Sequence, residues 1–183
     1  MVVPVLMSTE IECGCIPLPG VGDRVEWHLL WAADDSGPGS VRVDWSEQRP
    51  VPPSRVGDPG GVLLVDGPLS AFWRRTAAEA PTSGVLLAEI HGPLPGPLSA
   101  TGGRVLAVAV VEQTYQRTWN QDPGGRFGWI REPVHDDFSL RQVDRCPRYF
   151  HELDLPVTGD AHDPDLSRAE AGVLVQLELA GDH

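Results

Sequence analysis

Three cysteines carry the most distinctive chemistry in this chain. Cys13 and Cys15 flank a single glycine, and Cys146 stands far from them in the sequence. Thiolates bind zinc well, but paired cysteines of structural zinc sites are usually separated by about two to four residues, so that both sulfurs reach one tetrahedron. The Cys-Gly-Cys spacing is tighter. We therefore interpret the cysteines as inert loop thiols, with zinc binding and a redox or disulfide role as the alternatives.

A His-Asp-Asp run at 135–137 places an imidazole beside two carboxylates. A metal-dependent hydrolase or a general acid–base pair could use such a group. Short His-Asp matches are common by chance, and the segment has the pattern of a loop or a strand end. No cofactor is predicted outside the metal alternative, whose candidate ligands are Cys13, Cys15, Cys146, His135, Asp136 and Asp137.

Six tryptophans are many for 183 residues. Four of them fall on apolar sides of predicted elements and are assigned to the core. Trp119 and Trp129 instead lie among Gln, Asn, Arg and Gly, which favours exposure, and exposed aromatic rings can stack on ligands or contact partners. The candidate binding residues are Trp119, Trp129, Arg126 and Phe127.

Two motifs of hydrolytic enzymes, the serine elbow and the phosphate-binding loop, are missing from the sequence. No serine lies in a Gly-x-Ser-x-Gly elbow, and the glycine-rich run 124–128 lacks the lysine and the Ser or Thr of a phosphate-binding loop. Nucleotide hydrolysis therefore has no support.

Alternation of apolar and polar residues predicts most of the secondary structure. Strands are expected over 24–31 and 41–46, as an antiparallel pair with one solvated face, because their apolar residues recur at every second position. Further strands are expected over 62–65, 84–91, 105–111, 149–155 and 173–179, with the fully apolar run 105–111 as the core strand. Loops are expected over 48–61 and 158–169, and a bend or short hairpin near 124–128.

One segment changes period. The apolar positions fall at helical spacing, with Pro68 before them and a proline after them: Leu69, Phe72, Trp73, Thr76, Ala77 and Ala80. The pattern predicts one short helix over about 68–80. The whole set then predicts a mainly β fold, an antiparallel small barrel or sandwich-like domain with that one helix. The chain is read as one β-rich domain, 1–183, or as two sub-halves joined by the Pro/Gly loop 92–103.

Charge limits the classes of partner. The formal net charge is −12, and every one of the 14 basic residues is arginine. A net negative charge opposes approach to nucleic acid and to anionic membranes, so neither is an expected partner. Residues 131–183 hold 12 acids against 5 arginines, which gives a solvated acidic surface or a face for a basic partner.

The start of the chain and the cysteine count favour the cytoplasm. The first residues lack a positive n-region and reach Glu10 too soon for a secretory signal, and no apolar run is long enough to span a bilayer. Three cysteines are few for a disulfide scaffold, which agrees with a reducing compartment.

Two neighbouring motifs carry a resemblance. The run 12–15, Glu-Cys-Gly-Cys, followed by 21–27, Val-Gly-Asp-Arg-Val-Glu-Trp, resembles an uncharacterised actinobacterial domain family in which a Cys/Gly cluster precedes a Val-Gly-Asp-x-Val-x-Trp strand. The similarity extends loosely to 83–91 and 174–177. The resemblance implies a compact β-domain from an actinobacterium and no activity. Cys-Gly-Cys departs from the adjacent cysteines of that family, so no shared cysteine role is implied.

Three functions are compatible with these observations. The first is a noncatalytic cytoplasmic module that binds a protein or a small ligand through loops and exposed aromatics. The second is an acidic inhibitor or immunity-type protein that covers a basic site on its partner. The third is the small metal-assisted enzyme described above. Because fold does not imply function, the fold class alone cannot decide between them.

Overall fold

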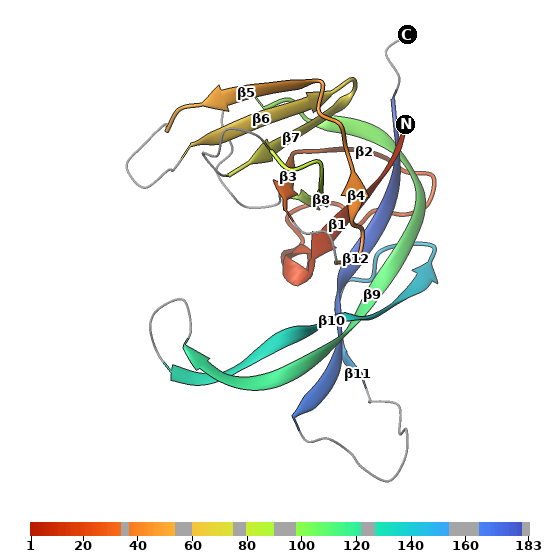
Figure 1. Ribbon diagram of the computed structural model, residues 1–183. Helices are drawn as coiled ribbons and strands as arrows, with labels where there is room; N and C mark the ends of the chain where they lie inside the picture. The colour runs from red at the N-terminus through yellow and green to blue at the C-terminus, as the bar shows by residue number, and fades with distance from the viewer. Residues whose placement is uncertain are drawn as a thin grey trace.

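The computed structural model describes residues 1–33, 37–53, 60–74, 80–89, 98–121, 127–153 and 165–180. Nearly all regular structure in these ranges is β-strand (Figure 1). In chain order the elements are β1 (Val2–Ser8), the 3₁₀ helix η1 (Thr9–Cys13), β2 (Arg24–Trp27), β3 (Leu29–Ala32), β4 (Val41–Arg42), β5 (Glu47–Val51), β6 (Gly61–Asp66), β7 (Leu69–Trp73), β8 (Ser83–Ala88), β9 (Thr101–Gln121), β10 (Phe127–Val143), β11 (Glu152–Leu153) and β12 (Leu166–Leu179).

The strands form one open, mixed sheet. Its order is β10-β9-β12-β1-β8-β3-β7-β6-β5, with β11, β2 and β4 added beside β12, β9 and β8. The pairings β1 with β8 and β3 with β7 are parallel, and the other pairings of the described strands are antiparallel. The prediction of a mainly β fold is confirmed, and the sandwich-like alternative agrees with it. Strands β10 and β5 are the two ends of this order. Because they do not pair with each other, the sheet does not close into a barrel.

One large apolar cluster lies against the sheet. Strand β1 shows how the sequence builds it, because Val3, Val5 and Met7 are buried while the residues between them are less so. Strands β2 and β3 continue the alternation with Trp27, Leu29 and Trp31, as predicted for 24–31. His28 interrupts that run between the two strands, so the expected single strand is two. The indole of Trp31 packs edge-on against that of Trp45, with ring centroids 5.1 Å apart. The other buried residues of the cluster come from strands along the whole chain, from β1 to β12.

The prediction of a helix over 68–80 is wrong for its first half. Residues 69–73 form β7, and 75–79 lie outside the described residues. All five side chains of β7 are buried, because Leu69, Ala71 and Trp73 join the large cluster while Phe72 packs with Leu63 and Leu98 on the other face. A strand covered on both faces shows no alternation, so its apolar residues can imitate helical spacing.

Two other expectations need correction. The predicted loop 48–61 contains edge strand β5, where Pro50 costs little because an edge strand does not need every N–H. The predicted pair of 24–31 with 41–46 does not form, because β4 pairs with β8 and β3 lies between β8 and β7. The predicted loop 92–103 lies partly outside the described residues, and its last three residues begin β9.

Strand β9 links the two ends of the molecule (Figure 1). It has 21 residues and pairs with β2 near its start, with β12 along its middle and with β10 over its second half. The apolar run 105–111 is part of this strand, as predicted, although Leu106 is 41% exposed. The final strand is also confirmed, but β12 begins at Leu166, inside the predicted loop 158–169.

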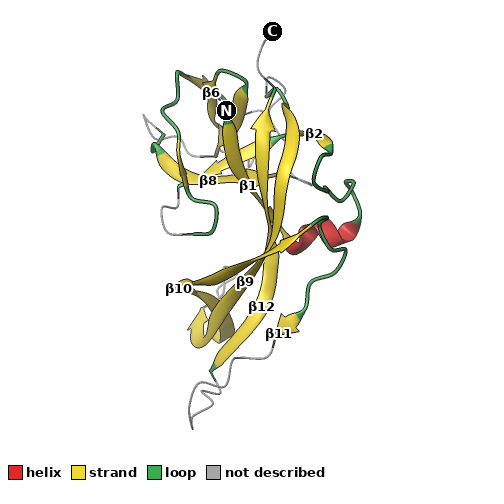
Figure 2. Ribbon diagram, turned by 90° about the vertical axis from the view of Figure 1, so that its right-hand side faces the viewer, coloured by secondary structure: helices red, strands yellow, loops and turns green. Residues whose placement is uncertain are grey.

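Both neighbours of β9 carry a bulge at the same level. On β10 the register shifts between Pro133 and Phe138, and on β12 it shifts between Glu170 and Gly172. Extra residues on one strand bend it and increase its twist. Figures 1 and 2 show the result, in which the far halves of β9 and β10 extend away from strands β1 to β8.

Of the described residues, none belongs to a helix with the length and apolar character that a membrane crossing would need.

Gly172 is the position at which the β12 bulge depends on glycine. Its φ is +146°, and a Cβ there would lie 2.2 Å from the backbone oxygen of Met7. Gly172→Ala should therefore lower the free energy of unfolding by roughly 2–4 kcal/mol, measured by urea denaturation. Gly128→Ala is the matched control, because no atom lies within 4 Å of its Cβ position. Equal losses in the two variants would contradict this account of the bulge.

Candidate functional site

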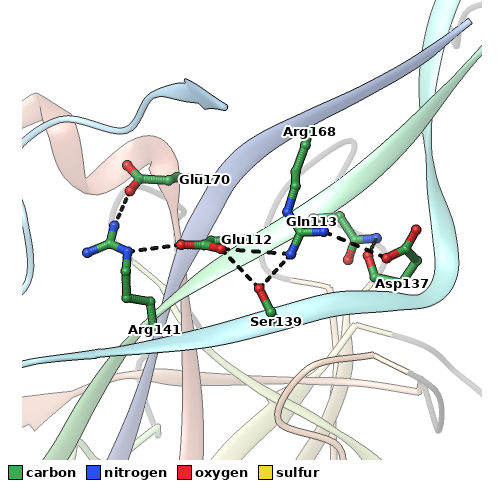
Figure 3. Close-up of polar contacts among 7 residues, drawn as sticks. All are labelled: Glu112, Gln113, Asp137, Ser139, Arg141, Arg168 and Glu170. Carbon is green, nitrogen blue, oxygen red and sulfur yellow. Dashed lines mark hydrogen bonds and ion pairs between the residues drawn. The ribbon is translucent and has the colours of Figure 1, made fainter. Parts of the chain in front are cut away.

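Seven polar side chains gather on β9, β10 and β12 where the two bulges face each other. The register places Ser139 of β10 and Glu170 of β12 on either side of Glu112 of β9. Residues directly opposite each other on paired strands project from the same face, so these side chains meet. We call the group the bend cluster, and Figure 3 shows its members: Glu112, Gln113, Asp137, Ser139, Arg141, Arg168 and Glu170.

Glu112 is at the centre of the bend cluster. Arg141 donates through Nε to its Oε1 at 2.9 Å, and Ser139 donates through Oγ to its Oε2 at 3.0 Å. A second cation, Arg168, lies 3.8 Å from Oε2. The hydrogen bond from Arg141, with that from Ser139 and the two positive charges, lowers the pKa of Glu112 below its ordinary value of 4.5.

Arg141 holds a second carboxylate as well. Its Nη2 pairs with Oε1 of Glu170, whose side chain is only 5% exposed. Oε2 of Glu170 accepts the backbone N–H of His151 at 3.0 Å. Two carboxylates on adjacent strands would repel each other, and the guanidinium between them compensates that repulsion by pairing with both. The hydrogen bond to Glu112 also raises the pKa of Arg141, which keeps it charged.

Every carboxylate oxygen of Glu112 and Glu170 already has a partner within the chain. These contacts tie β9, β10 and β12 together where the sheet bends.

Gln113 supports the β10 bulge from the side of β9. Its Nε2 donates to the backbone oxygens of Thr114, Val134 and Asp137 at 2.9, 2.8 and 3.1 Å. The side chain is buried, and these contacts satisfy carbonyl groups that the interrupted ladder leaves without strand partners. The bulge is thereby fixed in one conformation.

The predicted His-Asp-Asp group lies within this bulge. His135, Asp136 and Asp137 are all exposed, and Asp136 has a φ of 58°. The Asp137 Oδ1 lies 3.8 Å from Nη1 of Arg168, so one of these carboxylates faces a cation of the bend cluster.

The cysteines occupy two different environments. Cys13 and Cys15 are exposed at the end of η1, where the backbone N–H of Cys15 donates to Sγ of Cys13 at 3.1 Å. The side-chain hydrogen bond with Cys13 raises the pKa of the Cys15 thiol. Cys146 is buried in the apolar core, and burial raises its pKa to about 11, which makes it a poor nucleophile.

Within the described ranges, no three His, Cys, Asp or Glu side chains form a group that could hold a metal ion. The structure thus does not bring the six candidate ligands together, and metal binding stays a prediction from the sequence.

The two candidate tryptophans meet on the ribbon arm, which we define as residues 114–121 of β9 with residues 127–133 of β10. Trp119 and Trp129 are direct cross-strand partners, 59% and 54% exposed, and their ring centroids are 5.5 Å apart in an edge-to-face arrangement. The next pair on the same face is Arg117 with Arg131. The guanidinium carbon of Arg117 lies 4.5 Å from the centre of a Trp129 ring, and Arg131 pairs with Glu152 of β11.

Of the other two candidate binding residues, only the backbone of Phe127 is described, opposite Gln121 and two positions before Trp129. Arg126 lies outside the described residues, and Phe127 begins β10 without a described side chain. Most of the bend or short hairpin expected near 124–128 lies outside the described residues; β9 ends before it at Gln121 and the long strand β10 begins at Phe127.

A hollow of about 350 Å³ runs beside the arm toward the start of β12. The backbone N–H of Arg117 donates to the backbone oxygen of Asp165 at 2.7 Å, which closes one end of the β9 to β12 pairing. The hollow is lined by Arg117, Trp129, Ile130, Arg131, Asp165, Leu166 and Ser167.

A larger groove of about 860 Å³ lies at the opposite end of β9. Arg24 and Arg104 are cross-strand partners there, and Glu26 and Glu178 also line the groove. The two positive and two negative side chains balance, so the groove has no strong charge preference.

Sequence reasoning missed Arg117 and every member of the bend cluster except Asp137. Glu112 and Glu170 are separated by 57 intervening positions, and only the pairing of β9 with β12 brings them together. One local signal was present, because a glutamate directly after the apolar run 105–111 marks a place where the burial pattern changes.

The family assignment comes from comparison of the whole chain. A family model described as "Family of unknown function (DUF6578)" matches residues 1–179. The chain belongs to the DUF6578 family. The resemblance to an uncharacterised domain family is thus confirmed, whereas the actinobacterial origin stays a prediction. No curated protein and no solved structure matches the chain.

The pKa of Glu112 predicts a specific loss of stability in acid. Because its folded-state pKa lies below the ordinary 4.5, ionised Glu112 contributes its stabilisation fully above about pH 4.5, and the contribution is lost as the pH falls through the folded-state pKa. Glu112→Gln should lower the free energy of unfolding at pH 7 and flatten its decline below pH 4.5, measured by urea denaturation across pH.

Glu178→Gln is the control for this experiment, because Glu178 is exposed and makes no ion pair with the rest of the described chain. The control should keep the stability profile of the unsubstituted protein. An unchanged acid profile in Glu112→Gln would contradict the role of this carboxylate.

Proposed function

We propose that this DUF6578 protein is a noncatalytic binding module whose ribbon arm recognises another protein. The observation that carries the proposal is the pair of exposed tryptophans at 119 and 129, held on a projecting two-stranded ribbon. Exposed indoles are costly in water, and tryptophan and arginine dominate the binding energy of protein interfaces.

The shape of the arm supports a protein rather than a small molecule as partner. Most small-molecule sites are concave and enclose the greater part of their ligand. Trp119 and Trp129 instead lie side by side on a ribbon face, with Arg117 and Arg131 in the adjacent cross-strand pair. Because Arg131 is paired with Glu152, the cation of this face is Arg117, beside Trp129. A broad aromatic face with one such arginine suits a protein surface with apolar and acidic groups.

The acidic-inhibitor alternative draws less support from the contacts. Several acids of the region 131–183 are used inside the chain, since Glu152 pairs with Arg131, Asp137 with Arg168 and Glu170 with Arg141. Charges engaged in this way are less available for a basic partner.

Native mass spectrometry on protein purified gently from its own host tests the proposal. The unsubstituted chain should retain a protein partner, and Trp119→Thr/Trp129→Thr should weaken that complex at least about 30-fold, as expected for loss of interface hot spots worth ~2 kcal/mol. Threonine keeps a strand-favouring residue at both positions. Hydrogen exchange of residues 114–121 checks that the arm stays formed.

Tyr149→Ala is the matched control, because Tyr149 is 60% exposed and lies outside the arm. It should leave the complex intact. A complex that survives the double substitution would remove the arm from the interface. A bound metal or small molecule in place of a protein would favour the other functions.

A further inference from the structure

The Cys13-Gly14-Cys15 segment forms a tight, exposed turn. Cys13 ends η1, and Gly14 follows in the left-handed conformation with φ 72°, its N–H donating to the backbone oxygen of Ile11 at 3.1 Å. The helix is anchored, because Ile11 is fully buried and Ser8 accepts the N–H of Glu10 at its other end. The two thiols thus project from a fixed turn into solvent.

The turn brings the two cysteines together. The N–H of Cys15 donates to Sγ of Cys13 at 3.1 Å, so that sulfur already lies over the backbone of its partner. A disulfide bridges Cα atoms roughly 4.4–6.8 Å apart. Two cysteines separated by one residue are two Cα–Cα steps of about 3.8 Å apart along the chain, and a turn shortens the direct distance between them. Gly14 has no side chain to obstruct the approach, and its positive φ suits glycine.

A cation also lies at this turn. If Gly14 carried a Cβ, that atom would be 3.5 Å from Nη1 of Arg148, so the guanidinium lies over the glycine between the two cysteines. The sulfur of Cys13 is the one that accepts a backbone N–H, from Cys15, so we take Cys13 as the attacking residue in the exchange described next.

We propose that Cys13 and Cys15 form a dithiol–disulfide site that exchanges with low-molecular-weight disulfides. The Cys13 thiolate attacks one sulfur of a disulfide RSSR, its S–S bond breaks, and one RS⁻ leaves and takes a proton. The Cys15 thiolate then attacks Sγ of Cys13 in the mixed disulfide and expels the second RS⁻. Two cysteines are oxidised, losing two hydrogens and two electrons, and RSSR is reduced to two RSH.

The position of the turn makes this disulfide labile. It closes a very small loop in an exposed segment, and strained or exposed disulfides have more oxidising potentials than structural ones. Because neither thiol belongs to the apolar core, the bond can form and break while the sheet stays folded.

Intact-mass spectrometry after equilibration in glutathione redox buffers tests the proposal. The unsubstituted chain should become lighter by about 2 Da, the mass of the two hydrogens lost, and should return to its starting mass as reduced glutathione is increased. Cys146→Ser should behave in the same way. Cys13→Ser and Cys15→Ser should each stop at a mixed disulfide, heavier by one glutathione.

Two results would overturn the proposal. One is a chain that stays fully reduced in the most oxidising buffer, and the other is glutathione addition to Cys13 and Cys15 independently, without loss of two hydrogens. Thermal unfolding of Cys13→Ser and Cys15→Ser is the control for folding. Unchanged unfolding temperatures would show that their different oxidation products come from the lost thiol and not from a disturbed fold. The arm variant Trp119→Thr/Trp129→Thr should oxidise normally, so this site and the proposed interface succeed or fail separately.

Discussion

The architecture depends on one constraint: β9 stays paired while the strands on both of its sides contain extra residues. A continuous strand flanked by two bulges must change direction where the bulges lie. The bend turns one uninterrupted sheet into a body and a projecting arm. It also exposes polar backbone and brings charged residues of three strands together, so its stability rests on the bend cluster, where Arg141 joins Glu112 and Glu170.

The bend in β9 also determines what keeps the ribbon arm ordered. A two-stranded ribbon is marginally stable in water without further packing. Here the ribbon begins at the bend cluster, is closed against β12 by the bond from Arg117 to Asp165, and carries the aromatic pair near its far end. The tryptophans therefore contribute to the order of the arm as well as to its surface, which couples the shape of the arm to the contacts it can make.

A strand could be predicted from the sequence when one of its faces is buried and the other is exposed to solvent. Half-buried strands were read well, because Trp27, Leu29 and Trp31 alternate with more exposed residues. Strand β7 was misread since burial on both faces removes that alternation, and β5 was missed because Pro50 is tolerated only at an edge. Most described residues of β10 are exposed, so its sequence shows little alternation of apolar and polar residues and the strand could not be predicted.

The candidate sites show the same limit. The exposure of Trp119 and Trp129 could be inferred from their polar neighbours, but their pairing required the register of β9 with β10. Glu112 and Glu170 gave almost no signal, because their importance comes from a contact between distant strands. Local chemistry such as Cys-Gly-Cys is visible in the sequence, whereas its exposure and its turn geometry are not.

The position of β1 has a consequence for how the protein is made. This first strand pairs along its whole length with β12, from Val2 opposite Glu178 to Ser8 opposite Gly172, and Leu179 bonds back to Met1. Val3, Val5 and Met7 belong to the core, yet the strand beside them is the last described one to leave the ribosome. During synthesis β1 can pair with β8 first, at Val5 with Leu86 and Leu6 with Leu87, but its other edge stays without its partner until β12 has been made. Folding that waits for so distant a pairing is expected to be slow.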